Sequence, residues 1–260
     1  MDTMNDTGRI RGALLPIVTV VAAVISLEVA VVILKPPAHL LPAPSAVLYE
    51  LVYSLPNTLP HLSITTVEAF FGFALGNVAA ALFAVAFSQV RLVRVAVYPV
   101  FIALQAVPII AIAPFVGIWF GTGLVGKAAI SALICYFPAT VIMTDALLNV
   151  NRDGLKFMQS MGASQLEVFR HLAFPTAVPS VLAALQVSST LCFVGAIVAE
   201  LSGADSGIGF LILKASYEYR TSTLFALLIL ISAVTVTFYL AVATIARKVA
   251  RRFTIQYASQ

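Results

Sequence analysis

Six apolar runs, separated by polar segments, dominate the hydropathy pattern of the chain. A helix needs about 20 mostly apolar residues to cross the hydrocarbon core of a membrane, and each run has roughly that length. The pattern therefore predicts six transmembrane helices: Ala13–Leu34, Ile64–Phe87, Val95–Phe120, Leu124–Leu147, Val178–Leu201 and Leu224–Ala246. The composition agrees, because 61% hydrophobic and 10% charged residues among 260 exclude an ordinary soluble domain. We expect an all-α, polytopic membrane protein.

The polar segments divide the chain into three parts. Residues 1–60 would form an N-terminal tail, a retained membrane anchor and an external connector, residues 61–246 a core of five spans, and residues 247–260 a basic tail. The connector is rich in proline, which interrupts helices, so we expect it not to be one helix. Within it, Ser45–Leu55 is predicted to be a short helix on the membrane surface.

Lys and Arg positions predict the orientation. Cytoplasmic loops carry an excess of these residues. A cytoplasmic N-terminus leaves only four of them outside, namely Lys35, Lys127, Lys214 and Arg220. Both termini and the segment 151–175 then face the cytoplasm, and the protein is expected to be a multi-pass component of the cell (inner) membrane.

The polar segment Asn151–Pro175 has the features of two short helices. Asp153 is a candidate cap for the first helix, and Gly162 can adopt the left-handed conformation that commonly follows a helix end. Ser164 and Glu167 match a capping box, which predicts a second helix that ends before Pro175. Such helices could dock in a groove of a partner protein or lie among lipid headgroups, and both readings stay open.

We find no motif for catalysis or for binding a metal or cofactor. His39, His61 and His171 are far apart or on different sides of the membrane, and the sequence contains no phosphate-binding P-loop. Cys135 and Cys192 fall inside apolar runs and are expected to be buried small hydrophobic residues. The chain is therefore not expected to be an enzyme or to hydrolyse ATP itself.

Each ionisable residue inside the runs requires a structural or functional explanation, because inserting a charge at the centre of a membrane helix costs about 2.5–3.5 kcal/mol on insertion scales. Glu28 lies well along the first run, Glu68 near the outer start of the second, and Glu200 at the outer end of the fifth. Glu68 and Glu200 could simply be solvated at the interface. The alternative is that Glu200 belongs to a translocation path.

Three uncharged polar residues are further candidates for a path. Gln105 lies in mid-run close to Pro108 and would need a partner or a water-lined cavity. Gln186 and Ser189 lie one turn apart in the fifth run. The default reading of serine and threonine there is structural, since their hydroxyls often bond to carbonyls of their own helix.

Three separated stretches resemble one family of membrane proteins. They are QAVPIIAIAPFVGIWFG in the third run, MGASQLEVFRHLAFPTAVPSVLAAL in the polar segment and beyond, and AELSGADSGIGFLI after the fifth run. They resemble the permeases of binding-protein-dependent ABC importers, in the nitrate/sulfonate/taurine-type branch. The spacing from Gly162 to Pro175 matches the EAA loop of that family, and the resemblance covers roughly His61 to Arg247.

The chain departs from the family pattern at the start of this loop. Lys156, Phe157 and Met158 stand where the family has Glu-Ala-Ala, and Leu172 and Phe174 replace an isoleucine and a leucine. This weakens the expectation of an acidic contact on the first short helix, but the helix-turn-helix shape is unaffected.

The resemblance implies the type I ABC importer permease architecture and a coupling role for the loop. The loop would dock on a cytosolic ATPase subunit, and the contact candidates share this segment: Met161, Gly162, Ala163, Ser164, Leu166, Glu167, Phe169 and Pro175. Implied partners are two ATPase subunits, a periplasmic or lipid-anchored solute-binding protein and a second copy of the permease. No nucleic acid is implied.

The substrate class is less defined. Members of this branch carry nitrate, sulfonates, taurine, or pyrimidine and flavin vitamin precursors. The glycine-rich segment after Glu200 and the stretch Tyr217–Ala226 resemble the vitamin-precursor members more closely. Two alternatives of other classes are an ion-gradient-driven secondary transporter and a structural membrane protein without a pathway.

Overall fold

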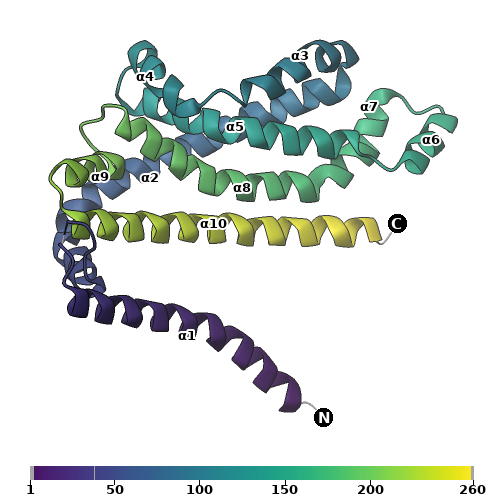
Figure 1. Cartoon of the computed structure of the whole chain (residues 1–260). Helices are drawn as coiled ribbons and strands as arrows, with labels where there is room; N and C mark the ends of the chain where they lie inside the picture. The colour runs from purple at the N-terminus through teal and green to yellow at the C-terminus, as the bar shows by residue number, and fades with distance from the viewer. Residues whose placement is uncertain (1–2, 38, 259–260) are drawn as a thin grey trace. The chain divides into compact units, whose positions relative to one another are not determined.

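The computed structural model describes residues 3–37 and 39–258, and the side chains of 18–37, 39–151 and 153–251. Arg9, Arg11 and the end of the basic tail, on which part of the predicted orientation rests, lie outside the described side chains. In the described chain the helices are α1 Thr3–Leu34, α2 Pro44–Gln89, α3 Arg91–Leu104, α4 Ile109–Phe120, α5 Leu124–Leu148, α6 Arg152–Ser160, α7 Gln165–Val168, α8 Phe174–Leu201, α9 Ile208–Tyr217 and α10 Thr221–Ala258 (Figure 1). A π-helical turn, Phe169–Ala173, joins α7 to α8.

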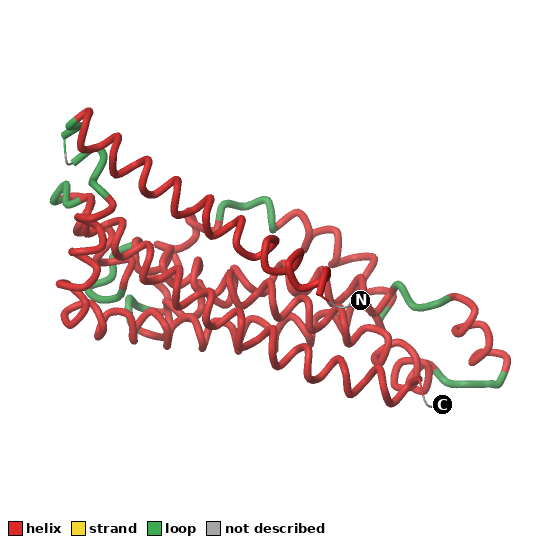
Figure 2. The backbone as a smooth tube through the Cα atoms, turned by 90° about the horizontal axis from the view of Figure 1, so that it is seen from below, coloured by secondary structure: helices red, strands yellow, loops and turns green. Residues whose placement is uncertain are grey.

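The all-α class is confirmed, since helices and loops account for every described residue (Figure 2). Four described stretches are long and apolar enough to cross a membrane: Pro44–Gln89, Leu124–Leu148, Gln165–Leu201 and Thr221–Arg251. In α1 the part with described side chains, Val18–Leu34, is a shorter apolar helix.

The third predicted span is not one straight crossing. Its residues form α3 and α4, which are bent by 100° at a short break. Pro108 causes the break, because it has extended backbone (ψ 109) and disfavours helical geometry in the residue before it. The pair is therefore a broken span or a re-entrant segment.

The prediction of a short helix at Ser45–Leu55 is wrong. That segment belongs to α2, which continues from Pro44 through Pro56 and Pro60 to Gln89. Each proline removes only one backbone donor, and the two are four residues apart, so both gaps fall on one side of the helix. Around the prolines, Ser54 and Thr58 donate their hydroxyls to helix carbonyls at 2.7 and 2.9 Å.

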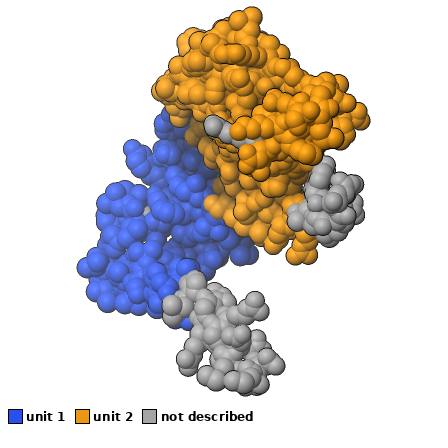
Figure 3. Space-filling view, turned by 90° about the vertical axis from the view of Figure 1, so that its right-hand side faces the viewer, with its two compact units in different colours: residues 1–58, 211–230 blue, residues 59–210, 231–260 orange. Residues whose placement is uncertain are grey.

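The chain forms two compact units, which Figure 3 colours separately. Unit 1 comprises residues 1–58 and 211–230, and unit 2 comprises residues 59–210 and 231–260. The predicted three-part division at residues 60 and 246 stays a prediction. Within unit 1, Arg220 forms an ion pair with Glu50 at 3.0 Å, and Thr223 donates to the same carboxylate at 2.8 Å.

Helices α5 and α8 pack closely in unit 2, side by side in Figure 1. Ser131 of α5 donates its hydroxyl to the carbonyl of Cys192 on α8 at 2.8 Å. A Cβ atom at Gly195 on α8 or at Gly72 on α2 would collide with Ser131. Small residues thus let three helices approach closely, as is usual in membrane helix packing. Cys135 and Cys192 are buried there, as predicted.

Candidate functional site

The first half of the 151–175 loop is a short helix with a defined start and end. The side chain of Asn151 accepts a hydrogen bond from the backbone N–H of Asp153 at 2.9 Å. Asn151 is therefore the cap, and the prediction that Asp153 caps this helix is wrong, since Asp153 lies in its first turn. At the other end Gly162 has φ +79, which confirms the predicted left-handed stop. The N–H of Ala163 donates to the carbonyl of Met158 at 3.0 Å, which completes a Schellman motif.

The second half contains the predicted capping box. The Ser164 N–H donates to Glu167 Oε2 at 2.7 Å, and the Glu167 N–H donates to Ser164 Oγ at 3.4 Å. The Ser164 N–H and hydroxyl both donate to the carboxylate, so the pKa of Glu167 is lowered from its ordinary value.

The second helix does not end before Pro175, contrary to the prediction. The chain stays helical through the π turn, in which the N–H of Phe174 donates to the carbonyl of Phe169, five residues earlier. Pro175 then falls in the first turn of α8, a position where a missing N–H is tolerated. The loop is consequently joined to α8 by continuous helix.

The loop exposes large apolar side chains. Met161 is 72% exposed and Leu166 is 69% exposed, and Phe157 is exposed as well. Phe169 instead packs against the apolar core of unit 2. The remaining predicted contact residues, Gly162, Ala163, Ser164, Glu167 and Pro175, lie around these side chains and range from half-buried to exposed. A surface of this kind suits docking on another protein.

A cavity of about 530 Å³ lies beside the loop within unit 2. Arg91 and Arg94 of α3 line one part of it, and Leu155, Gln159 and Val168 of the loop line another. The loop is thus not packed tightly against α3.

The predicted path residues are not brought together. Gln105 is exposed in the turn after α3. Gln186 is half-buried on α8, and Ser189 is buried and donates its hydroxyl to the Gln186 carbonyl at 2.6 Å, as the structural reading expects. Glu200 lies 14 residues after Gln186 on the same helix, about 21 Å along its axis. Their role as path lining stays a prediction.

Glu200 is fully buried, so the reading that it is solvated at an interface is wrong. Its Oε1 accepts the hydroxyl of Thr65 at 2.7 Å, and its Oε2 accepts the N–H of Gly209 at 2.5 Å. Thr65 also accepts the N–H of Ile208 at 2.8 Å. The carboxyl group therefore fastens the beginning of α9 to α2.

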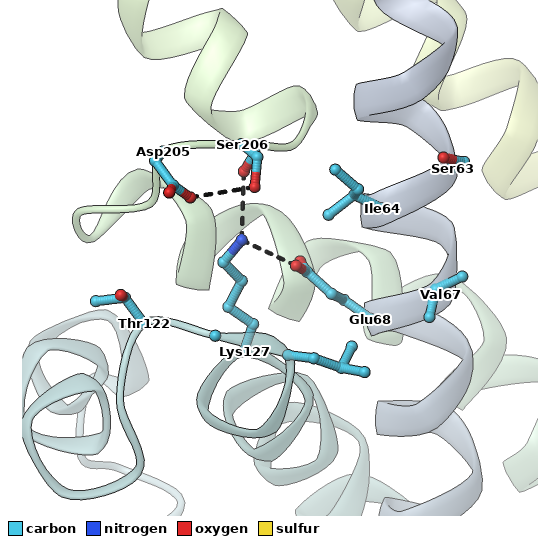
Figure 4. A pocket seen from close by; sticks show the side chains of 10 residues that line it. Ser63, Ile64, Val67, Glu68, Thr122, Lys127, Asp205 and Ser206 are labelled. Atoms are coloured by element: carbon cyan, nitrogen blue, oxygen red, sulfur yellow. Dashed lines mark hydrogen bonds and ion pairs between the residues drawn. The ribbon is translucent and has the colours of Figure 1, made fainter.

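Glu68 is also buried, and it has a partner that sequence reasoning missed. Lys127 Nζ lies 2.9 Å from Glu68 Oε1 and donates to the carbonyl of Ser206 at 3.3 Å (Figure 4). Lys127, which the sequence places at the outer start of the fourth run, lies in the first turn of α5 and is 4% exposed. An adjacent cavity of about 370 Å³ is lined by Asp205 and Ser206 among others. We call Thr65, Glu68, Lys127 and Glu200 the carboxyl cluster.

Comparison with solved structures supports the architecture. The chain is similar to an amino acid ABC transporter crystallised with histidines (TM-score 0.60, 17% identity, covering 77% of this chain and 96% of that chain). It is also similar to the MetNI methionine ABC transporter in an inward-facing form (TM-score 0.59, 21% identity, covering 76% and 96%). At these identities the likeness concerns the fold, which is that of a type I ABC importer permease.

Curated relatives are similar over most of their length. A probable ABC transporter permease protein of Haemophilus influenzae is 28% identical, covering 79% of this chain and 84% of the relative. The formylaminopyrimidine transport permease protein ThiX of Halalkalibacterium halodurans is 32% identical, covering 75% and 78%. The riboflavin transport system permease protein RibX of Chloroflexus aurantiacus is 28% identical, covering 83% and 81%.

The family model of the binding-protein-dependent transport system inner membrane component matches residues 72–255. The match includes the 151–175 loop, α5, α8 and Glu200, and permeases for aliphatic sulfonates and taurine are also among the relatives. The chain therefore belongs to the inner-membrane permease family of binding-protein-dependent ABC transport systems, in its nitrate/sulfonate/taurine-type branch.

Proposed function

We propose that this chain is the membrane subunit of an ATP-driven importer, in which the 151–175 loop receives the movement of separate cytosolic ATPase subunits. The observation that carries the proposal is the loop itself, a capped pair of helices that exposes Met161 and Leu166. The caps hold the two helices in place, and the exposed apolar side chains suit docking in a groove of another protein.

The connection to α8 suggests how movement would pass into the membrane. The π turn makes the loop continuous with α8, and α8 packs along α5. A displacement of the loop would therefore shift α8 against α5, while the small residues at their contact permit close sliding. Glu200 lies at the far end of α8 from the loop. In this way one helix would link ATPase movement to the opposite side of the protein.

The proposed assembly has two copies of this permease, two ATPase subunits and an external solute-binding protein. The termini and the loop would face the cytoplasm, as the Lys and Arg positions favour. The external binding protein would then meet the side that carries the carboxyl cluster.

We further propose an uncharged, nitrogen-containing vitamin precursor as the solute, of the kind named for the pyrimidine and riboflavin relatives. The supporting observation is that Lys127, a buried cation of the core, is already neutralised by Glu68. A sulfonate-type anion would have to compete with that carboxylate for the ammonium group. The sulfonate relatives keep this second class as the alternative.

Uptake measurements test the proposal most directly. Proteoliposomes that contain the permease, its genomically neighbouring ATPase and the neighbouring binding protein should take up labelled solute only with internal ATP. Uptake driven by an ion gradient without the ATPase would overturn the proposal in favour of a secondary transporter. No uptake in either condition, with ligand-loaded binding protein present, would favour a structural role.

Substitution of Gly162 tests the loop. Gly162→Val forces a β-branched residue into φ +79 at the turn between α6 and α7, so we expect ATPase attachment and uptake to fall at least tenfold. Gly121→Val is the control outside the loop, because Gly121 also has a positive φ (+78) and open space around it but lies between α4 and α5. Equal ATPase attachment in both variants and the parent would contradict the role of the loop.

A further inference from the structure

The carboxyl cluster encloses three ionisable side chains in a membrane protein core. Glu68 is 1% exposed, Glu200 is 0% exposed and Lys127 is 4% exposed. With both carboxyl groups ionised, the three would carry one uncompensated negative charge. Burial of an unpaired charge is strongly unfavourable, so the cluster needs one more positive charge.

The hydrogen bonds show where that charge is missing. Both oxygens of Glu200 accept hydrogen bonds, from Thr65 and Gly209, and Glu68 Oε1 accepts from Lys127. Glu68 Oε2 is buried and has no donor among the described residues. Thr65 and Glu68 are three residues apart on α2, so the Glu200 carboxyl group, which is bonded to Thr65, lies beside the face of α2 that carries Glu68. Ionised carboxylates can only accept hydrogen bonds, so a contact between the two carboxyl groups requires a proton on one of them.

The other groups that face the pair do not supply the charge. On α2, His61 Nδ1 accepts the N–H of Gly207 at 3.0 Å, so that ring nitrogen carries no proton. On α5, the positive charge of Lys127 is already included in the net charge of the cluster. Between α8 and α9 the nearby titratable group is Asp205, which is another acid. None of the described groups that face the two carboxyl groups therefore supplies the missing positive charge, and one proton would supply it.

We propose that Glu68 and Glu200 bind a single proton between them and that this proton holds the α8–α9 turn, Ser202–Gly207, against α2. The shared proton makes the cluster neutral, gives Glu68 Oε2 a partner and lets Glu200 keep its bonds to Thr65 and Gly209. Carboxyl pairs that share a proton occur where two acids are too close for both to ionise. This inference does not depend on the transported solute.

Infrared spectroscopy of the full permease in detergent tests the shared proton. At neutral pH we expect a C=O stretch of one protonated, water-inaccessible carboxyl group, with slow exchange in D2O. The band should be absent in Glu68→Gln and in Glu200→Gln. A parent protein without such a band, or a band that survives in Glu68→Gln, would overturn the proposal.

Stability against pH provides a second readout. In Glu68→Gln the amide can accept from Lys127 and donate to an ionised Glu200, so every hydrogen bond and the charge balance are kept. Since the folded parent holds a proton that an ordinary unfolded glutamate releases above its pKa of about 4.3, its folding constant should fall with rising pH, by up to tenfold per unit. Glu68→Gln should lose this slope between about pH 6 and 9.

Glu68→Met is the matched variant of similar size without a donor. It should show lower thermal stability than Glu68→Gln at every pH, because Glu200 then lacks the donor and Lys127 lacks its acceptor. If Glu68→Gln is no more stable than Glu68→Met, or if it keeps the slope of the parent, the shared proton is excluded. Should a variant fail to fold, the pH titration of the infrared band in the parent still decides.

Discussion

The 151–175 loop keeps apolar side chains on its surface, whereas the carboxyl cluster keeps charged side chains inside. In the loop, Met161 and Leu166 face outward and the polar groups serve as helix caps. In the cluster, Glu200 and Lys127 are enclosed and bond across helices. Each region inverts the usual placement of its residue types. Substitutions in the cluster should therefore damage the fold, and substitutions in the loop should damage association.

The largest effect is expected from Lys127→Met. Removing one partner of a buried ion pair leaves an uncompensated charge, and the loss of unfolding free energy should be about 3–5 kcal/mol. Arg220→Met removes a partner of the half-exposed pair with Glu50 and should cost about 1 kcal/mol or less. Reversible unfolding of each variant in mixed micelles measures both. If the two variants lost similar amounts of unfolding free energy, burial would not explain any difference in strength between the two ion pairs.

An intermediate effect is expected from Gly207→Ala. Gly207 has φ +108, and a Cβ atom there would collide with the Glu200 carboxylate. Strain and displacement of the carboxyl group should together cost about 1–3 kcal/mol. Gly203→Ala is the control, because Gly203 has φ +119 but nothing within 4 Å of an added Cβ. The difference between the thermal unfolding midpoints of the two variants measures the cost of the collision with Glu200. Equal midpoints would show that the turn adjusts to the added Cβ atom without cost.

The smallest effect on stability is expected from Ser164→Ala in the loop. Loss of the cap should destabilise α7 locally by about 1 kcal/mol, without changing the unfolding of the rest of the chain. Amide hydrogen exchange should rise in residues 165–168, and ATPase attachment should weaken. Ser160→Ala removes a hydroxyl bonded to the Phe157 carbonyl within α6 and should leave exchange in α7 unchanged. A global loss of stability in Ser164→Ala would contradict the separation of the two regions.

Local signals made the loop readable from the sequence. The left-handed Gly162 and the Ser164–Glu167 box depend on residues within one or two turns, and both are confirmed. Assigning the cap to Asp153 was wrong because Asn151 and Asp153 are two residues apart and both can cap. The prediction of a helix end before Pro175 was wrong because the π turn continues the helix to Phe174, and Pro175 then lies in the first turn of α8, where a missing N–H is tolerated.

The carboxyl cluster could not be read in the same way. Glu68, Lys127 and Glu200 come from three helices far apart in the sequence, and each alone looks like a residue near a membrane interface. Their pairing depends on how α2, α5 and α8 pack, which no short pattern encodes. The glycines of the α8–α9 segment were the available signal, since Gly207 and Gly209 leave room for the Glu200 carboxyl group.

The π turn at Phe169–Ala173 has a geometric consequence for α8. A π turn contains about one residue more than an α turn, so there is one extra residue at the N-terminal end of α8. Conversion of this turn to α geometry would advance α8 by one residue, which is about 1.5 Å along the axis and 100° about it. Such a change would rotate the face of α8 that carries Gln186 without breaking the helix.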